Sequence, residues 1–463
     1  MLDRATVFGK QQDSSGKSRP GPLLNQGGGI LSKMPDDEIL ISASRHLETA
    51  LSDRAHCDLP ELGRRWSIFA AWIRGSISSF RNSIEAIHFA QQEVGFEPML
   101  STEKLTSLSP TLKNDIRHDF PIYERFIEGF YESTHLLPSS VAKEGDKLVS
   151  FALFQNIITI FDVLSLSDPA PRSILEVGGG YGGPARAWML NPISKPQRYV
   201  ILDLPESLFF AEVFLRKEFG SQAVHYVRRG ENLNDMLSDI QPKIILCPLT
   251  CHRELLPLAF DIVINTRSMG EMSQDWIDFY CKYLEALVTK YFYSCNTFGR
   301  PIDNLAQDTN LFSPKLTKDW LLRHTACARE VYGKNYIRTL YEKCKINEIN
   351  TGKYNEELEG ILRRPFDVLS FLKMIDYFRL LQDENCALAI IKYCTERLDY
   401  FPKELIYLLE WLKLYGSSNF CRRHKSEVDT LFAKLREARA SGTEAQVSPA
   451  LEARIADSRF KLS

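Results

Sequence analysis

The amino-acid sequence predicts an α/β fold, in which helices separate the strands of a mostly parallel sheet and helical regions precede and follow it. Two observations carry this prediction. Residues Ser173–Pro184 have the pattern of a short buried strand, a glycine-rich turn and the start of a helix, and Tyr199–Asp203 has that of a second strand ending in an acid. Further apolar runs near Ile244, Asp261 and Lys290 alternate with helical segments, which is typical of a parallel sheet.

A helical cap is expected before this domain. Residues 1–35 contain few clustered apolar side chains, so we expect a disordered, mobile tail there. Apolar residues then recur at helical spacing, which predicts an all-helical region over residues 36–147. Aromatic and charged residues gather between Thr111 and Pro138, and this stretch is either a lid over an acceptor pocket or a surface for helix packing.

The α/β domain itself is expected over residues 148–345. An amphipathic helix over Leu148–Leu164 leads into the first strand, and Arg329–Tyr341 alternates on both sides of a Gly-Lys-Asn turn, as a β-hairpin does. This hairpin completes a Rossmann-like sheet of seven strands. The stretch Val224–Val227 is left open, as an additional strand or an edge.

A second helical region follows this domain. Beyond Pro365 consecutive helical segments predict an appendage over residues 365–440, which is expected to make homodimer contacts or to pack on the chain itself. The polar residues 441–463 are expected to form a flexible tail.

Composition predicts a soluble, globular protein of two or three domains. The 463 residues include 57 Lys and Arg against 59 Asp and Glu, with no basic stripe, so we expect no nucleic-acid partner. The ten cysteines are scattered, and neither a signal peptide nor an apolar run of membrane-spanning length is seen, which favours the cytoplasm, free thiols and no membrane span. Cys247 and Cys251 beside His252 give only half of a metal site, so no metal is expected.

The glycine-rich turn is the strongest functional signal. Gly178, Gly180 and Gly182 let the backbone approach a ligand closely, and Pro184 is tolerated in the first turn of a helix whose free amides point at the loop. The spacing G-x-G-x-x-G also fits a dinucleotide site, with Asp203 bonded to a ribose hydroxyl.

An acid two residues before the first glycine distinguishes between two cofactors. Glu176 gives the pattern Glu-x-Gly-x-Gly-x-Gly, the form found in class I methyltransferases that use S-adenosylmethionine. A carboxylate suits the ammonium group of that cofactor and would repel a pyrophosphate. We therefore expect S-adenosylmethionine, with an NAD-dependent oxidoreductase or a ligand-free glycine turn as alternatives. The expected cofactor contacts come from Glu176, Gly178, Gly179, Gly180, Tyr181, Gly182, Asp203, Leu204, Pro248, Asn265 and Ser268.

The polar segment after the fourth strand is expected to carry the chemistry. Phe260–Asn265 is this strand, and Thr266–Met272 follows it at the rim where parallel sheets bind ligands. Glu271 is the expected general base for in-line methyl transfer to a hydroxyl, or else a plain acid at a helix N-terminus. Arg267 could bind an acidic acceptor or pair with Glu271. Three histidines are further candidates for the base, each with a competing structural role: His135, which we include in the catalytic set, His225 and His252.

Three segments together resemble the sugar O-methyltransferase family, which occurs with bacterial surface-polysaccharide and glycoside biosynthesis. They are Ile174–Gly183, Val200–Pro205 and Asp261–Glu271, and the resemblance covers residues 130–300. It implies a class I methyltransferase fold, S-adenosylmethionine as methyl donor and a carbohydrate or glycoside hydroxyl as acceptor, and it names no catalytic residue. The large helical flanks leave a non-catalytic assembly module as a third hypothesis.

Overall fold

The computed structural model describes residues 37–92, 94, 102–121, 130–135, 141–144, 147–234, 243–297, 320–327 and 336–343, with short stretches between 356 and 433. The chain divides into two compact units. The first comprises Met1–Thr266, Ala286–Thr289 and Glu330–Tyr332, and the second comprises Arg267–Glu285, Lys290–Arg329 and Gly333–Ser463. The predicted tails and most of the predicted helical region 365–440 lie outside the described residues.

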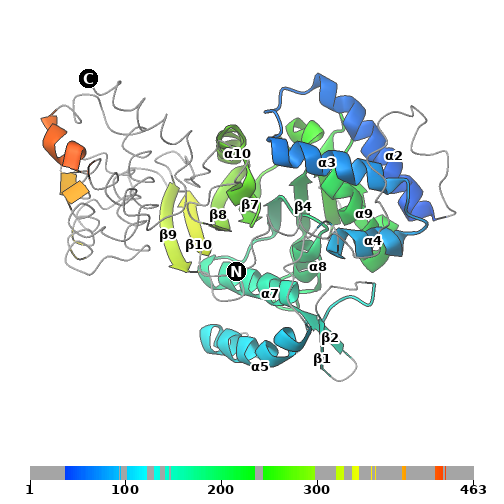
Figure 1. Cartoon of the computed structure of the whole chain (residues 1–463), viewed down its shortest axis with the longest axis horizontal. Coiled ribbons are helices and arrows are strands. Elements are labelled where there is room, and N and C mark those ends of the chain that lie inside the picture. Colours follow the sequence, from blue (N-terminus) through cyan, green and yellow to red (C-terminus); the bar gives the residue numbers. More distant parts are fainter. Residues whose placement is uncertain are drawn as a thin grey trace, which may run out of the picture. The chain divides into compact units, whose positions relative to one another are not determined.

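Within the described residues the central sheet has eight strands, in the order β5-β6-β4-β3-β7-β8-β10-β9. Figure 1 labels strands β4, β7, β8, β10 and β9 of this sheet. Strand β10 (Tyr336–Lys343) pairs antiparallel with β8 (Val288–Thr297) and with β9 (Trp320–Cys327). The other strands are parallel: β3 (Ser173–Val177), β4 (Arg198–Asp203), β5 (Val224–Tyr226), β6 (Lys243–Pro248) and β7 (Phe260–Thr266). The predicted α/β fold with a mostly parallel sheet is confirmed.

The eighth strand is the segment that the sequence pattern left open. In β5, Val224 pairs with Ile244 and Tyr226 pairs with Leu246 of the parallel strand β6. Both β5 residues are buried, whereas His225 between them is half-buried, as expected for an edge strand with one covered face. The sheet therefore has one strand more than the seven predicted.

Strand β3 lies where the direction of chain progression reverses. It pairs with β4 on one side and with β7 on the other, and every one of its residues is buried. In open α/β sheets, ligands bind outside the carboxyl ends of the strands at such a switch point. The glycine loop, which follows Val177, is therefore at the position where this fold class binds ligands.

The helix before β3 differs from its prediction in two ways. Helix α7 (Phe151–Leu166) begins at Phe151 because the Ser150 hydroxyl caps it, accepting the N–H of Leu153 at 3.0 Å. The predicted helix is present, but it starts at Phe151 and not at Leu148, and it is buried around most of its circumference and so is not amphipathic. Residues Lys147–Ser150 form strand β2 instead, which pairs with β1 (Val141–Glu144).

The region before this hairpin is mostly helical, as expected. Its described part contains the α-helices α2 (Glu38–Asp53), α3 (Arg64–Ile77), α4 (Ser83–Gln92) and α5 (Thr102–Asp119). Because β1 lies within residues 36–147, the prediction that this region is entirely helical is wrong at its end.

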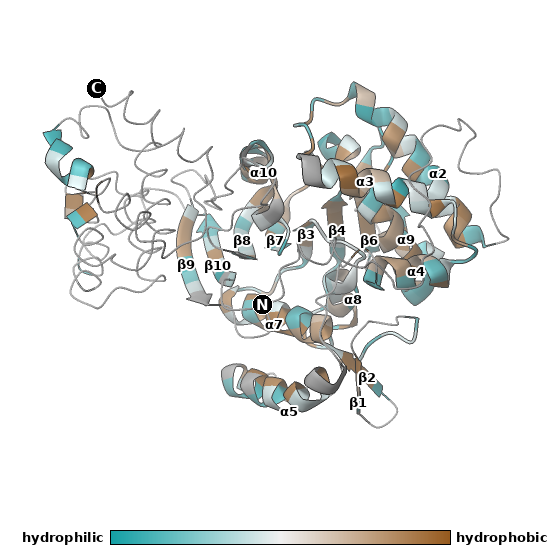
Figure 2. Ribbon diagram, viewed as in Figure 1, coloured by the Kyte–Doolittle hydropathy of each residue, from teal (hydrophilic) through white to brown (hydrophobic). Residues whose placement is uncertain are grey.

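Helix α9 (Pro205–Phe219), which follows β4, is covered on two sides. It contacts the parallel strands β4, β5 and β6 as well as α2, α3 and α4, and every residue from Pro205 to Leu215 is buried. Phe80 and Phe89 pack on Phe210 with ring centroids 6.3 and 6.0 Å apart. Figure 2 shows hydrophobic residues on α9 and on the neighbouring strands. The N-terminal helices therefore complete the hydrophobic core of the first unit.

The antiparallel end of the sheet contains one arm of the predicted hairpin, although the strand paired with it lies elsewhere in the sequence. Strand β10 agrees with the second arm of the predicted hairpin. Its partner β9 is Trp320–Cys327, whereas the predicted first arm, residues 329–332, lies outside the described residues. Among the helices that the structure describes, none has the length and apolar character needed to cross a lipid bilayer.

Candidate functional site

The loop after β3 has a backbone that requires glycine. Gly178, Gly180 and Gly182 have φ angles of 76°, 57° and 91°, a region that side chains disfavour. The Gly178 N–H donates to the Leu202 carbonyl of β4 at 2.9 Å, and the Gly182 N–H donates to the Gly179 carbonyl at 3.0 Å. The loop is thus folded tightly over the carboxyl ends of β3 and β4.

Helix α8 (Gly183–Leu190) starts directly from this loop. Gly182 is its N-cap residue and Pro184 lies in its first turn, where a missing N–H is tolerated. The free N–H groups of the first turn carry a partial positive charge. The beginning of α8 is therefore suited to a negatively charged part of a ligand, such as a carboxylate.

Glu176 is buried near the glycine loop and keeps only 1% of its surface exposed. Burial raises the pKa of this carboxyl to about 8, although a hydrogen bond from the Tyr199 hydroxyl, at 3.0 Å, opposes the shift. The nearby Asp203 carboxylate raises the pKa further. Without a positive charge beside it, Glu176 is therefore mostly protonated at neutral pH.

Tyr199 is a site residue that sequence reasoning missed. In the parallel register Glu176 pairs with Ile201, and Ile174 pairs with Tyr199. Because side chains two residues apart share a face of a sheet, the Tyr199 hydroxyl can reach the Glu176 carboxyl diagonally. A tyrosine in an otherwise apolar buried strand was the available signal.

Asp203, the last residue of β4, stabilises the glycine loop through hydrogen bonds. Its carboxylate accepts the Gly180 N–H at 3.0 Å and the Leu204 N–H at 2.7 Å. Burial raises the pKa of Asp203 to about 7, against the lowering effect of these bonds and of one from Ser207. An ionised carboxylate offers about four acceptor positions, so Asp203 can hold the loop and still accept a ligand hydroxyl.

Gly179 leaves room for the buried acid, and its replacement is expected to disturb the site. A Cβ atom at this position would lie 2.6 Å from Ile201 Cγ2 and 2.8 Å from Glu176 Oε2. We expect Gly179→Ala to lower the free energy of unfolding by about 1–3 kcal/mol through overpacking, measured by urea denaturation.

Gly75→Ala is the matched control for this substitution. Gly75 lies inside α3 with no atom within 4 Å of the added Cβ, so this variant should be stabilised by about 0.5–1 kcal/mol. Equal stability of the Gly179→Ala and wild-type proteins would contradict the close packing around Glu176.

Three further predicted cofactor residues have structural contacts in the first unit. The Asn265 side chain, fully buried at the end of β7, donates to the Val177 carbonyl at 2.7 Å and ties β7 to β3. The Tyr181 ring is 6% exposed and packs against Phe214, with ring centroids 5.4 Å apart. Pro248 ends β6. Their contacts with a cofactor stay predictions.

The predicted catalytic segment lies in the second unit. Arg267 has a φ angle of 63°, which is unusual for a residue with a side chain, and its N–H donates to the Cys295 carbonyl at 2.8 Å. The half-buried Ser268 precedes a 3-10 turn, Met269–Glu271, which in turn precedes helix α10 (Gln274–Leu287). The Glu271 side chain lies outside the described residues, so its role as base stays a prediction.

The three histidines have local contacts. His252 is buried, its Nδ1 lies 2.9 Å from the Leu249 carbonyl, and burial lowers its pKa. His225 Nε2 lies 2.8 Å from a Glu231 carboxylate oxygen. His135 is half-buried, and its backbone N–H donates to the Ser133 hydroxyl at 3.0 Å. The contacts of His225 and His252 favour the structural role, and the catalytic role of His135 stays a prediction.

Part of the segment proposed as a lid packs against helices. Phe130 is buried against Phe161 of α7, with ring centroids 6.1 Å apart. The Tyr131 carbonyl accepts a hydrogen bond from the Arg186 guanidinium of α8 at 2.8 Å. For residues 130–135 these contacts favour the helix-packing alternative over a lid, and residues 122–129 lie outside the described residues.

A glycine loop at the switch point of a mostly parallel sheet, with an acid at the end of the next strand, defines a Rossmann-like α/β protein. No protein-family model and no curated protein matches the chain. Among solved structures, it is similar to Burkholderia thailandensis 1,6-didemethyltoxoflavin-N1-methyltransferase bound to S-adenosylhomocysteine, at 13% identity and a TM-score of 0.27, over 54% of this chain and 93% of that one.

Two other solved structures are comparably distant. TehB from Haemophilus influenzae has 12% identity and a TM-score of 0.27, over 40% of this chain and 62% of that one. An rRNA methylase from Escherichia coli has 9% identity and a TM-score of 0.27, over 66% of this chain and 98% of that one. Likeness at this level assigns neither a family nor an acceptor, and the fold assignment rests on the chain's own strand order.

Proposed function

We propose that this chain is an S-adenosylmethionine-dependent O-methyltransferase that acts on a sugar hydroxyl in bacterial polysaccharide or glycoside biosynthesis. The observation that carries the proposal is the buried acid Glu176, which has no cationic partner within the part of the chain that the structure describes. A ligand with an ammonium group would provide that partner and favour the ionised carboxylate. The amino-acid half of S-adenosylmethionine has such a group.

The residues around the loop fit the other parts of this donor. The free amides at the start of α8 suit its carboxylate, and the remaining acceptor positions of Asp203 suit the ribose hydroxyls. The bound donor would supply an electrophilic methyl group. The buried Glu176 disfavours a dinucleotide, because its carboxylate would lie beside the pyrophosphate.

The acceptor and the base are proposed from the sequence. The three segments that resemble the sugar O-methyltransferase family favour a carbohydrate hydroxyl, and the balanced charge of the chain favours a small acceptor over a nucleic acid. Glu271 would take the proton from this hydroxyl, Arg267 would bind or orient the acceptor, and His135 is retained as a further candidate base. Leu204, Pro248, Asn265 and Ser268 complete the proposed donor site.

Calorimetric titration of the full chain with S-adenosylmethionine tests the proposal. We expect saturable binding to one site, with a dissociation constant of about 1 μM to 1 mM, the range typical of enzyme ligands. A parallel titration with NADH, followed by its fluorescence, is expected to show no saturable signal. A saturable NADH fluorescence signal in a protein that does not bind S-adenosylmethionine would contradict the proposal and favour the oxidoreductase alternative.

A further inference from the structure

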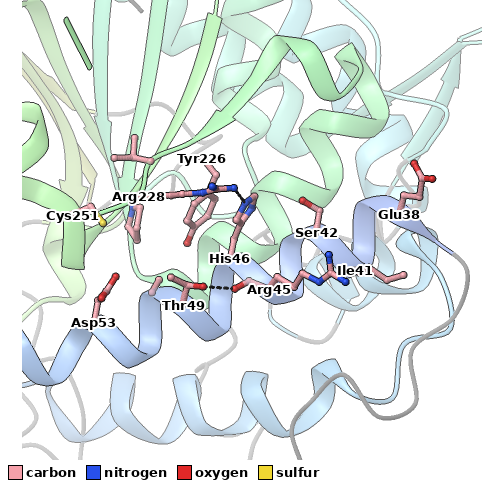
Figure 3. A pocket seen from close by; sticks show the side chains of 13 residues that line it. Glu38, Ile41, Ser42, Arg45, His46, Thr49, Asp53, Tyr226, Arg228 and Cys251 are labelled. Atoms are coloured by element: carbon pink, nitrogen blue, oxygen red, sulfur yellow. Dashed lines mark hydrogen bonds between the residues drawn. The ribbon is translucent and has the colours of Figure 1, made fainter. Parts of the chain in front are cut away.

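The first unit contains a cavity of about 600 Å³ that is not lined by any residue of the glycine loop (Figure 3). It lies between helix α2 and the carboxyl ends of β5 and β6, and residues of both strand ends, Tyr226 and Pro248, line it. Its volume is within the range of small-molecule sites, and carboxyl ends of parallel strands are where such sites form. Of the lining residues, Pro248 also belongs to the proposed donor site.

Two arginines give the cavity an excess of positive charge. Arg45 of α2 and Arg228, just after β5, both line it, and both are exposed. Within the described residues neither guanidinium has a carboxylate partner. Of the two lining acids, Asp53 lies 3.9 Å from the Arg229 guanidinium, which leaves Glu38 as the acid without an ion pair in the described part. Among the described lining groups without an ion pair, two arginines therefore stand against one acid, which gives a net positive charge.

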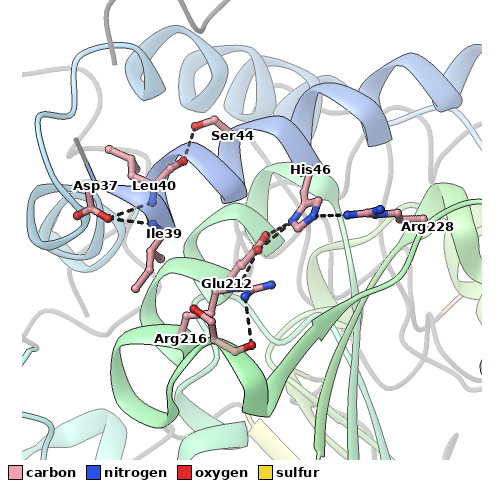
Figure 4. Close-up of polar contacts among 9 residues, drawn as sticks. Asp37, Ile39, Leu40, Ser44, His46, Glu212, Arg216 and Arg228 are labelled. Atoms are coloured by element: carbon pink, nitrogen blue, oxygen red, sulfur yellow. Dashed lines mark hydrogen bonds and ion pairs between the residues drawn. The ribbon is translucent and has the colours of Figure 1, made fainter. Parts of the chain in front are cut away.

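A network of polar contacts holds His46 between the cavity and α9 (Figure 4). Its Nδ1 lies 2.8 Å from a carboxylate oxygen of the fully buried Glu212, and its Nε2 lies 3.5 Å from Arg228 Nη2. A carboxylate only accepts, so Nδ1 is the donor in the contact with Glu212. Glu212 also accepts from Arg216 at 2.8 Å, so Arg216 rather than Arg228 balances its charge.

Tyr226 contributes a hydroxyl without a partner at the same place. Its ring stacks on His46, with centroids 4.6 Å apart, and only 5% of its surface is exposed. The buried hydroxyl has no hydrogen-bond partner among the described residues. Figure 3 shows the side chains of Tyr226, at the end of β5, and Arg228, just after it, close to that of His46, from α2. An unpaired buried hydroxyl is unfavourable, so a ligand that supplies a partner would be stabilised.

We propose that this cavity binds a small molecule that carries a diphosphate group, held by Arg45 and Arg228 and contacted by the Tyr226 hydroxyl. Guanidinium groups match phosphate oxygens in pairs, and two of them suit a group with more than one negative charge. The inference does not require the proposed methyl transfer, although one residue, Pro248, both lines the cavity and belongs to the proposed donor site.

Calorimetry with inorganic pyrophosphate, uridine diphosphate and uridine, at 0.15 M salt to screen non-specific attraction, tests this site. We expect saturable binding of pyrophosphate and uridine diphosphate but not of uridine. Arg45→Ala and Arg228→Ala should each weaken binding of both phosphate probes at least tenfold. Arg81→Ala is the matched control, since Arg81 is 84% exposed and pairs with Glu85 in α4, and it should bind as the wild type does.

The Tyr226→Phe variant tests whether the Tyr226 hydroxyl contacts the ligand or only stabilises the fold. Because the hydroxyl has no partner in the described part of the chain, this variant should unfold at the wild-type temperature or higher, while its affinity for the phosphate probes falls several-fold. Absence of saturable binding, unchanged affinity in any of the three variants, or competition between pyrophosphate and S-adenosylmethionine for one site would overturn the proposal.

Discussion

Replacing Glu176 by Gln is expected to weaken S-adenosylmethionine binding about 100-fold at pH 8, which corresponds to about 3 kcal/mol. The reason is that the amide cannot form a charged pair with the donor ammonium group, although it still offers an oxygen to the Tyr199 hydroxyl. Isothermal calorimetry on the Glu176→Gln protein measures the loss. Glu85→Gln, which removes a surface acid paired with Arg81, is the matched control and should bind normally.

The same substitution should leave the cofactor-free protein at least as stable as the wild type. The pKa of Glu176 rises from 4.5 to about 8 on folding, so the folded chain keeps a proton that the unfolded chain releases. Its contribution to the free energy of unfolding therefore falls as the pH rises from 4.5 towards 8. Thermal unfolding at pH 6 and pH 8.5 should show a smaller decrease in Tm for Glu176→Gln than for the wild type.

Donor affinity should depend on pH for the same reason. The donor ammonium group prefers the ionised carboxylate, whose population increases about tenfold per pH unit below its pKa. Wild-type affinity should thus rise between pH 6 and pH 8, with release of a proton, whereas Glu176→Gln should keep only the smaller rise due to Asp203, whose pKa of about 7 lies in the same range. Wild-type affinity that is flat over this range, or a variant that binds as tightly as the wild type, would contradict a charged contact at Glu176.

The second large effect is expected from Glu271→Gln, which should lower kcat by about 10²–10⁴ while leaving donor affinity unchanged. The amide of Gln has nearly the same size as the carboxyl group of Glu, but it cannot take the proton from the hydroxyl group of the acceptor. The measurements are turnover on an acceptor found among nucleotide sugars and glycosides, and the calorimetric dissociation constant of the donor. Asp275→Asn, which removes an exposed acid in the first turn of α10, is the control and should keep full turnover.

The two roles considered for Glu271 predict different results. If this residue only favours a helix N-terminus, Glu271→Gln should lower the free energy of unfolding by about 0.3–1 kcal/mol and leave kcat unchanged. Unchanged turnover would show that another residue is the general base. His135 would then be the next residue to be substituted.

Local patterns in the sequence predicted the parts of the fold that depend on local chemistry. The strand, glycine turn and helix from Ser173 to Leu190 follow from apolar runs and from backbone angles that only glycine adopts easily. Strand β4 and its terminal Asp203 could be predicted in the same way. The start of α7 was misplaced because an apolar run continues through β2, and the decisive signal was the capping hydroxyl of Ser150.

The remaining features depend on contacts between distant parts of the chain. His46 meets Glu212 across 166 residues of sequence, and neither residue belongs to a recognisable motif. The hydrogen bond between Tyr199 and Glu176 depends on strand register, which the sequence patterns do not give. The cavity beside α2 could not be predicted because its walls come from a helix and two strand ends that only the folded chain brings together.

The burial of α9 between the strands and the N-terminal helices restricts how this protein can be shortened. A polypeptide that started at the hairpin before α7 would contain the whole glycine loop and all parallel strands, but Phe209, Phe210 and their neighbours would lose part of their cover. A large exposed apolar surface promotes self-association. The glycine loop and the parallel strands are therefore not a transferable module, because a shortened protein would lack the helices α2, α3 and α4 that pack on α9.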